Sequence, residues 1–565
     1  MVDAFVSHLE ELSVDTIFGV PGGLLHPFFE AIERHSLLSL IVTKHEAGAA
    51  FMADGYARIK RTLAVCAATS GPGATNLLTG VGVAFSDGVP LLVLTGQAAS
   101  KNLGRGAVQE SGPQDVDIVK MFEPVTKYSA MVDHPARFTH HLRRALRLAI
   151  SGRPGPVHLN VPVDFWSEWV DLEELELERH TPSNKVFDPR AVERAAAALS
   201  RASRPVILAG GGVRDGQAAQ PLRRLAERLG ALVVTTPRGK GVFPEEHPRW
   251  AGVCGYGGHN CATELMLGDE PDVLFAVGAS LNETTTFGWH PELMPSETFI
   301  HLDIDPERIG RSYPVDIGLL GDAATILDEL AERVADTDER RSLREGWAAR
   351  HRGPSLRASS LQLNLALSGN TGLTPEAWRA ELEAVLPDDA LIFSDVGGHM
   401  LFNIHHLRIK QDQDFILNLG FGSMGHGTVA PIGAALADPG RPVVSIIGDG
   451  CFAMNGMDLL VAVEHDIPVV WIVENNQMHG ISWHISKMLS GHPLESINPD
   501  KPVDIASIAR SMGVQTHVVE SLGQLQRPLY DALEQRRGPT LIDVRVDPTV
   551  APPMEGRAKA IGGFR

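Results

Sequence analysis

One supersecondary plan occurs twice in this chain of 565 residues, once near each end, and it limits the folds the chain can adopt. Each copy runs from a glycine-containing turn through a helical stretch to an apolar strand that begins at a proline, first over Ser70–Gly96 and again over Gly448–Asn476. Strands that alternate with helices in this way build parallel sheets covered by helices on both faces. The sequence therefore predicts two similar, doubly wound α/β domains in the first and last thirds.

The middle third predicts a further α/β domain with its own core, as expected for a chain of this length. An acidic linker, Asp171–Asn184, ends the first domain, and an alanine-rich helix begins near Asp188. A charged and then polar stretch from Asp336 to Asn370 leads into the last domain. We predict domains over residues 1–170, 188–335 and 370–547, followed by a tail over 548–565.

The second copy of the plan carries polar residues at the ends of two predicted strands. Gly448-Asp449-Gly450 follows the strand Pro442–Ile447, and Asn476 follows Pro468–Val473, twenty-seven residues after the aspartate; a helix is predicted between them over Met454–His465. The carboxyl ends of parallel strands meet at the edge of a sheet where α/β proteins bind ligands. Carboxylate and amide oxygens suit Mg²⁺ in the company of a phosphate, which a helix N-terminus also favours. This edge therefore predicts a joint metal and phosphate site.

A glycine–aspartate turn alone is common, but this spaced pair resembles the diphosphate motif of the thiamine diphosphate (ThDP) enzymes. Lys44–Arg58 resembles the segment that carries the family's glutamate, Ser70–Asn76 the loop that follows it, and Gly420–Gly425 the segment before the metal motif. The likeness covers nearly the whole chain and is closest to the acetolactate synthase branch. It implies three doubly wound parallel-sheet domains, which the family supplies as pyrimidine-binding, central and diphosphate-binding.

The resemblance also implies roles for individual residues. Glu46 would hydrogen-bond the aminopyrimidine ring of ThDP, and Gln109 would lie beside the active centre. Asp449, Asn476 and the backbone carbonyl of Met478 would bind the metal. Contacts to ThDP would come from Glu46 and from residues of four loops, namely Gly398, His399, Gly422, Ser423, Met424, Gly448, Asp449, Gly450, Cys451, Asn476, Gln477, Met478, His479 and Gly480.

Missing proton donors narrow the reaction that the resemblance implies. Simple pyruvate decarboxylases place an acid where this chain has Gly23, a histidine pair around Gln109, and a glutamate where Ser482 stands. Without these groups, the fragment left by decarboxylation of a 2-keto acid should join a second carbonyl compound instead of leaving as an aldehyde. A ThDP- and Mg²⁺-dependent carboligase is therefore expected. Two alternatives stay open: a 2-keto acid decarboxylase or benzaldehyde-lyase-like enzyme, and a non-catalytic ThDP-binding subunit.

The central domain leaves a second cofactor open. Gly210-Gly211-Gly212 follows the strand Pro205–Ala209, as a dinucleotide loop would, but lacks the full fingerprint. The synthases carry Arg-Phe-Asp-Asp beside FAD, where this chain has Leu281–Thr284. FAD therefore remains open on the sequence. His26 adds a titratable group near the rim of the predicted site, and no role is assigned to it.

Composition and family together suggest the partners. A net charge of −19 disfavours nucleic acid and anionic membranes, and four cysteines are too few for a disulfide framework. With no signal peptide or membrane span evident, a cytoplasmic protein is expected. The resemblance implies a 2-keto acid and a carbonyl acceptor as small-molecule partners. It also implies a homodimer or homotetramer, in which the Glu46 domain of one subunit and the Asp449 domain of another clasp one ThDP.

Overall fold

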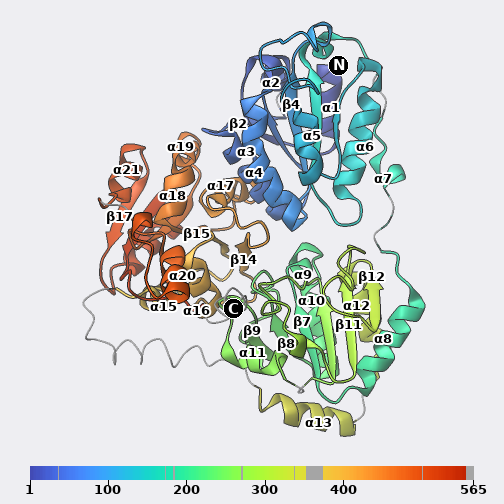
Figure 1. Ribbon diagram of the computed structural model, residues 1–565, viewed down its shortest axis with the longest axis vertical. Coiled ribbons are helices and arrows are strands. Elements are labelled where there is room, and N and C mark those ends of the chain that lie inside the picture. The colour runs from blue at the N-terminus through green and yellow to red at the C-terminus, as the bar shows by residue number, and fades with distance from the viewer. Residues whose placement is uncertain are drawn as a thin grey trace.

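Three six-stranded parallel sheets make up the protein (Figure 1). The computed structural model describes residues 1–565 apart from 36, 172–173, 182, 184, 269–270, 336–337, 352–372, 499–500 and 555–565. The predicted start of the last domain at residue 370 and the end of the predicted tail fall outside the described residues. The three-sheet architecture confirms the predicted fold class.

The first sheet has the strand order β2-β1-β3-β4-β6-β5. Its strands are β1 Thr16–Val20, β2 Ser39–Val42, β3 Ala64–Ala68, β4 Leu91–Gln97, β5 Ser129–Met131 and β6 Val157–Pro162. Its helices are α1 Val2–Glu11, α2 His26–Arg34, α3 Glu46–Lys60, α4 Pro72–Asp87, α5 Ile118–Phe122 and α6 Phe138–Ile150, and α7 Leu177–His180 follows. Neighbouring residues such as Ile17 and Phe18 pack into different buried clusters on opposite faces, as expected for a parallel sheet covered on both sides.

The third sheet repeats the topology of the first, with the order β14-β13-β15-β16-β18-β17. Its strands are β13 Leu391–Ser394, β14 Asp414–Leu417, β15 Val443–Gly448, β16 Val469–Asn475, β17 Gln515–Val519 and β18 Thr540–Arg545. Its helices are α15 Pro375–Val385, α16 Gly398–His406, α17 His426–Ala437, α18 Asp449–Asn455, α19 Leu459–Glu464, α20 Gly480–Ser490, α21 Ile505–Ser511 and α22 Gln526–Gln535. The repeated plan noted in the sequence thus corresponds to two sheets of one topology.

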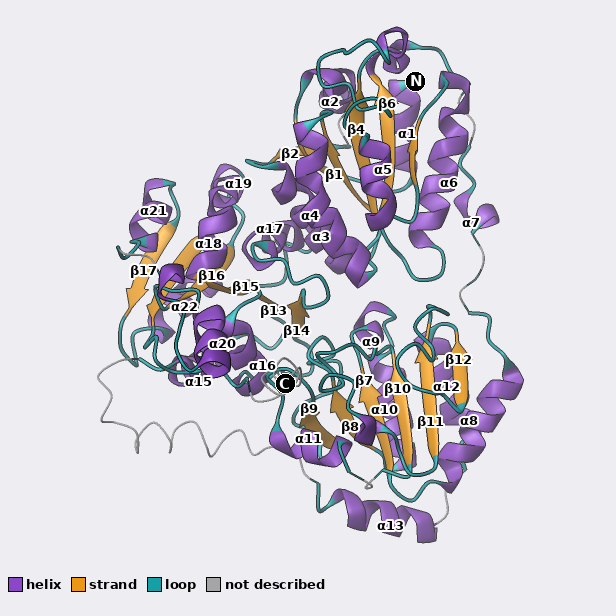
Figure 2. Ribbon diagram, in the orientation of Figure 1, coloured by secondary structure: helices purple, strands orange, loops and turns teal. Residues whose placement is uncertain are grey.

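The central sheet has a different order, β12-β11-β10-β7-β8-β9, which is the doubly wound order of dinucleotide-binding folds. Its strands are β7 Pro205–Ala209, β8 Leu232–Thr235, β9 Trp250–Val253, β10 Val273–Val277, β11 Thr298–Asp303 and β12 Ile317–Leu320. Its helices are α8 Pro189–Arg201, α9 Gly212–Asp215, α10 Ala219–Leu229, α11 Asn260–Met266, α12 Ala323–Arg333 and α13 Asp338–Ala348. Figure 2 shows these helices around the strands of the lower lobe.

The first and third domains pack on each other through α3 and α17, which lie between their sheets (Figure 2). Gly55 of α3 lies against the backbone carbonyl of Ala430, and Gly433 of α17 lies against that of Met52, so closely that a Cβ on either glycine would overlap the carbonyl. Helices can approach this closely only where a side chain is missing. One buried cluster runs from Phe18 in the first sheet to Trp471 in the third.

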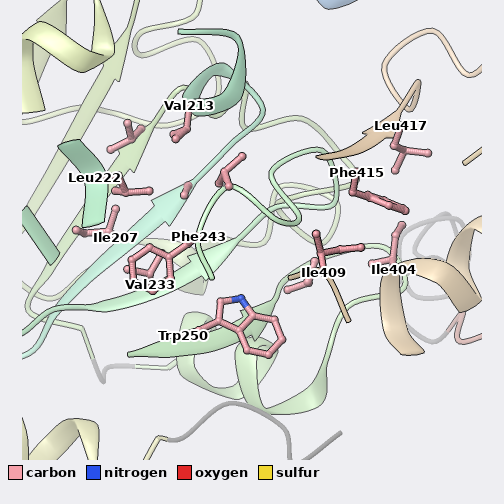
Figure 3. Packing of buried hydrophobic residues seen from close by; sticks show 14 of the residues in the cluster. Ile207, Val213, Leu222, Val233, Phe243, Trp250, Ile404, Ile409, Phe415 and Leu417 are labelled. Atoms are coloured by element: carbon pink, nitrogen blue, oxygen red, sulfur yellow. The ribbon is translucent and has the colours of Figure 1, made fainter. Parts of the chain in front are cut away.

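The central and third domains also share a core. Figure 3 shows Trp250 of the central domain near Ile409, which leads from α16 towards β14; Phe243 belongs to the same cluster. A Cβ on Gly241 would lie 2.7 Å from Cγ2 of Ile409, so this contact is tight. The three domains are therefore held together by apolar packing as well as by the chain.

Most strands begin and end near their predicted limits, and one helix does not. Pro205–Ala209 is a strand over the predicted residues, and the predicted Pro442–Ile447 becomes β15 with a shift of one residue. The single helix predicted over Met454–His465 is wrong: α18 begins at Asp449 itself and ends at Asn455, a 3-10 turn covers Gly456–Asp458, and α19 follows. The break falls at Gly456, whose missing side chain accommodates the ring of Phe452.

Candidate active site

Asp449 and Asn476 lie at the ends of two neighbouring strands of the third sheet. Gly448, the last residue of β15, pairs in parallel register with Glu474 of β16, so the residues that follow emerge side by side. Asn476 Oδ1 accepts a hydrogen bond from the Met478 N–H at 3.1 Å, which curls the loop back over the asparagine. A Cβ on Gly480 would lie 2.5 Å from Asn476 Nδ2, so a larger residue there would displace the asparagine amide. The predicted metal ligands are thus brought to one edge.

The environment of Asp449 suits a cation. Burial raises the pKa of its carboxyl group to about 7, because desolvation outweighs the backbone hydrogen bonds around it. A cation held nearby would favour the ionised form of this carboxyl group. Two side-chain oxygens and a backbone carbonyl are donors of the kind that Mg²⁺ prefers when it also binds a phosphate. The residues present therefore fit a divalent cation.

A cavity of about 570 Å³ opens beside this edge. Its polar side is formed by Asp449, Gln477 and His479, and its apolar side includes Phe452, Met454, Met457, Ile497 and Ile508. Met454 and Met457 are 58% and 57% exposed, which is unusual for large apolar side chains next to a polar site. The cavity combines a charged end with an apolar wall, as sites for amphipathic cofactors do.

His399 offers a second group to a ligand at the same edge. It is the second residue of α16, which begins at Gly398, and its ring lies on the Gly448 backbone, where an added Cβ would be 3.0 Å from Nδ1. Its Nε2 atom is buried and has no partner among the described residues. Burial lowers the pKa of His399 to about 3, so the ring is neutral. A buried ring nitrogen without a partner and a helix N-terminus beside it fit a diphosphate.

Met424 lies over the turn that contains Asp449. A Cβ on Gly450 would be 3.1 Å from Met424 Cε and 3.2 Å from the His479 ring. The segment is anchored by Asp395, whose carboxylate accepts hydrogen bonds from the N–H groups of Gly425 at 3.0 Å and Thr428 at 3.2 Å. Asp395, which the sequence analysis did not single out, therefore holds the segment that contains Met424 in its position over the site.

Several predicted cofactor contacts have their side chains engaged elsewhere. Cys451 Sγ donates to the Val396 carbonyl, and Ser423 Oγ donates to that of Met424. The Gln477 side chain pairs with both the N–H and the carbonyl of Val503, at 2.8 and 3.2 Å. Gly422 has a φ of +74°, a conformation that favours glycine. These four residues can offer a ligand backbone groups, and Gln477 also holds the segment before α21 in place.

Glu46 lies at the corresponding edge of the first sheet. It is the first residue of α3, and its Oε2 atom accepts a hydrogen bond from Asn76 Nδ2 at 2.9 Å. Its Oε1 atom is 3.4 Å from the Cβ position of Gly73, in the loop that resembles the family. His45 caps the helix by accepting from the Ala47 N–H, which fixes the helix start at Glu46.

Gln109 stands over the same loop. Its φ of +58° is uncommon for a residue with a side chain, and its carbonyl accepts from Ser70 Oγ at 2.8 Å. The Gly71 backbone would place a Cβ 3.4 Å from the Gln109 side chain. The structure therefore brings the Glu46 and Gln109 segments together at one edge, with the amide of Gln109 exposed.

Glu46 contacts α4 of its own domain, from a different face of α3 than the one that meets the third domain. The face of α3 that meets that domain contains Gly48, which packs on the Asp458 carboxylate, and Gly55, which packs on Ala430. At 3.6 residues per turn, Glu46 is about 160° around the helix from Gly48. The Lys44 N–H donates to Asp458 Oδ1 at 2.8 Å and so fixes the entry to the helix. The face of α3 with Gly48 and Gly55, and not the one with Glu46, therefore makes the contact within one chain.

Three domain families match this architecture in order. The N-terminal TPP binding domain of thiamine pyrophosphate enzymes matches residues 1–121, the central domain matches 192–330, and the C-terminal TPP binding domain matches 395–544. The chain belongs to the thiamine pyrophosphate enzymes. Thiamine pyrophosphate is ThDP, so the protein is a ThDP-dependent enzyme, and its Glu46 and Asp449 edges lie in the two TPP binding domains.

Full-length relatives point to one branch of these enzymes. A probable acetolactate synthase large subunit of Methanocaldococcus jannaschii is 34% identical over 98% of this chain and 93% of its own. The acetolactate synthase isozyme 3 large subunit of Escherichia coli is 31% identical over 96% and 94%, and an acetolactate synthase of Arthrospira platensis is 32% identical over 97% and 95%. The predicted likeness to acetolactate synthases is confirmed.

A second cavity, of about 730 Å³, lies where the three domains meet. Its lining includes Arg58, Arg153, Arg238 and, from the glycine run after β7, Gly211 and Gly212. A Cβ on Gly210 would overlap the Gly278 carbonyl, and one on Gly212 would lie 2.9 Å from Gly278 Cα. Close packing of two strand ends therefore explains these glycines without a nucleotide. None of the domain families or relatives named above supports FAD, and nucleotide binding here stays a prediction.

The part of the chain that the structure describes contains no helix both long and apolar enough to span a bilayer.

Proposed function

We propose that this enzyme decarboxylates a 2-keto acid such as pyruvate and joins the remaining fragment to a second carbonyl compound, using ThDP and Mg²⁺. Support comes from full-length relatives that are named acetolactate synthases. The observation that carries the proposal is the lack of an acid at two positions on the pyrimidine edge. Gly23 begins a 3-10 turn with open space around it, and Gln109 offers a neutral amide. Neither residue can protonate the fragment to release an aldehyde.

The resemblance to the family assigns roles to the residues, and their positions at the two sheet edges support these roles. Bound ThDP supplies the electron sink for decarboxylation and bond formation. Glu46 would hold a proton at the aminopyrimidine ring, and Met424 would pack against the cofactor. Asp449, Asn476 and the Met478 carbonyl would hold Mg²⁺, while His399 Nε2 and the N–H groups at the start of α16 and α18 would bind the diphosphate. Gln109 would face the substrate.

Product analysis tests the reaction. The protein is incubated with ThDP, Mg²⁺ and pyruvate, alone or with a panel of 2-keto acids and aldehydes, and products are identified by mass spectrometry. Acetolactate or another acyloin supports the carboligase. Free aldehyde as the main product would instead support the decarboxylase or lyase, and absence of turnover with bound ThDP would support a non-catalytic subunit.

The proposal includes a site shared between subunits in a homodimer or homotetramer. It is supported by Glu46, which lies on a different face of α3 than the one that meets the third domain of its own chain, and by the exposed Met454 and Met457 beside Asp449. Mixing Glu46→Gln with Asp449→Ala protein, after dissociation and reassociation, should restore activity, because half of the sites in a hybrid dimer carry both intact residues. Hybrids seen by native mass spectrometry without activity would exclude the shared site.

A further inference from the structure

Arg379 of α15 is a buried arginine whose hydrogen bonds reach two separate walls of the diphosphate edge. Its side chain is 1% exposed. Nη1 donates to Glu474 Oε2 at 2.6 Å, Nη2 donates to the His399 carbonyl at 3.0 Å, and Nε donates to Asn403 Oδ1 at 2.8 Å. The guanidinium stacks on the Trp378 ring, 4.3 Å from its centroid, and the Trp378 indole N–H donates to the same Glu474 oxygen.

These contacts join residues that adjoin predicted ligands. His399 is at the start of α16, and Glu474 is the last residue but one of β16, directly before Asn475 and Asn476. Between them lies β15, which ends beside Asp449. One side chain therefore spans the strand that leads to Asp449 and fixes the spacing between the wall with His399 and the wall with Asn476.

A simple stabilising role does not explain this arrangement well. Burying a charge pair costs desolvation free energy, and apolar replacements of a whole pair are often as stable. What a fixed, forked guanidinium provides is geometry, because its donors lie in one plane at set angles. Groups behind the ligands of a metal site orient those ligands in the same way.

We propose that Arg379 and Glu474 are positioning residues that hold the two walls of the ThDP diphosphate and Mg²⁺ site at the separation that binding requires. The proposal rests on the proposed roles of Asp449, Asn476 and His399. Neither residue would touch the cofactor, since both are buried behind the edge. The effect expected is on affinity for ThDP and Mg²⁺ before any turnover takes place.

Calorimetric titration of the apo-protein with ThDP at saturating Mg²⁺, and with Mg²⁺ at fixed ThDP, tests this. The central variant is Arg379→Met with Glu474→Leu, which removes both charges and leaves neither unpaired. ThDP affinity should fall roughly ten- to a hundredfold, as when groups behind metal ligands are removed. The melting temperature should also fall, because Asn403 and Trp378 lose their buried hydrogen-bond partners. Glu474→Gln, which is isosteric, should weaken binding less, and Arg379→Lys, which can reach one partner only, should be intermediate.

Arg344→Met provides a matched control. Arg344 is also fully buried and donates to the carbonyls of Ala202 and Leu229, but it lies in the central domain. It should lower the melting temperature and leave ThDP affinity unchanged. Wild-type affinity in both the double variant and Glu474→Gln would overturn the proposal, as would an equal loss in Arg344→Met.

The ThDP affinity of Asp449→Ala distinguishes a failure of the site assignment from a failure of the positioning role. If it loses ThDP binding while the Arg379 variants keep it, the site assignment stands and the positioning role is wrong. If Asp449→Ala itself binds ThDP with unchanged affinity, the assignment of the site is wrong, whatever the Arg379 variants do.

Discussion

The first and third domains have one topology and share a hydrogen bond between the side chains of two neighbouring strands, which we call the latch. The loops that the two latches support are different. In the first sheet, Gln97 ends β4 and donates to Asn160 of β6 at 3.0 Å. In the third sheet, Asn475 ends β16 and donates to Asp543 of β18 at 2.8 Å. Each donor is the last residue of a seven-residue strand, and each acceptor is the fourth residue of a six-residue strand. The two domains thus keep one cross-strand link at equivalent positions.

What the two latches hold is different. Gln97 also accepts from the Ser111 N–H and donates to its carbonyl, and Ser111 lies two residues after Gln109. Asn475 accepts from Gln477 and precedes the predicted metal ligand Asn476. The first latch therefore positions a loop that would face substrate, and the second positions a loop that would bind metal. The two domains share a fold, and a few side chains at the strand ends decide whether an edge would face substrate or bind metal.

The largest effect is expected from the chemistry on the first edge. Glu46→Gln should lower turnover about 10²–10⁴-fold, the usual contribution of one proton-transfer group, while ThDP affinity stays within roughly tenfold. Steady-state rates and calorimetry measure the two quantities. Glu33→Gln, an exposed glutamate on α2, is the control and should behave as wild type. Near-normal turnover in Glu46→Gln would remove this residue from its role.

Breaking the latch of the third sheet should affect binding. Asp543→Leu leaves the Asn475 amide without its buried acceptor, so the loop with Asn476 and Met478 loses its support. ThDP and Mg²⁺ affinity should fall roughly ten- to a hundredfold, measured by calorimetry. Turnover at saturating cofactor should recover to near wild type. A loss of turnover that saturating cofactor does not restore would contradict this separation.

Breaking the latch of the first sheet should affect turnover instead. Gln97→Leu leaves the Ser111 backbone groups unpaired, which lets the Gln109 loop shift relative to substrate. Rates should fall roughly tenfold through lost orientation, with ThDP affinity unchanged. If Gln97→Leu lowers the affinity for ThDP as much as Asp543→Leu does, the first edge does not act on turnover alone and the contrast between the two edges is wrong.

The smallest effect concerns pH. His158 of β6 is fully buried between Thr95 and Ser129, and burial lowers its pKa to about 3. The unfolded chain, with an ordinary histidine pKa, binds more protons below about pH 6.5, so stability is lost as pH falls through that value. Against His158→Gln, wild type should lose about 1 kcal/mol more between pH 7.5 and 5.5. Urea unfolding followed by circular dichroism measures this; equal slopes would exclude a neutral buried His158.

Local patterns in the sequence predicted the strands and the site loops well. Apolar runs such as Pro205–Ala209 mark buried parallel strands, and the polar residues after β15 and β16 indicate the ligand edge. Helix limits were harder, since the break at Gly456 depends on the ring of Phe452, which no periodic pattern reveals. The roles assigned to the predicted site residues stay predictions.

Supporting residues could not be predicted because their partners are far away along the chain. Arg379 reaches Glu474 across 95 residues, and Asn475 reaches Asp543 across 68. Glu474 did indicate a buried partner, because a charged residue near the end of a buried strand must be paired. The sequence does not say which of 50 Lys and Arg residues supplies it.

The close contact between α3 and α17 has a consequence for how the chain can be divided. Because Gly55 and Gly433 meet backbone carbonyls, the first and third domains form one body, although the middle third of the chain separates them in sequence. The central domain is in effect an insertion into that body. Fragments covering residues 1–187 and 188–565 keep the core shared by the central and third domains intact. When produced separately, they should therefore associate through these two helices, which makes the protein a natural starting point for a split enzyme.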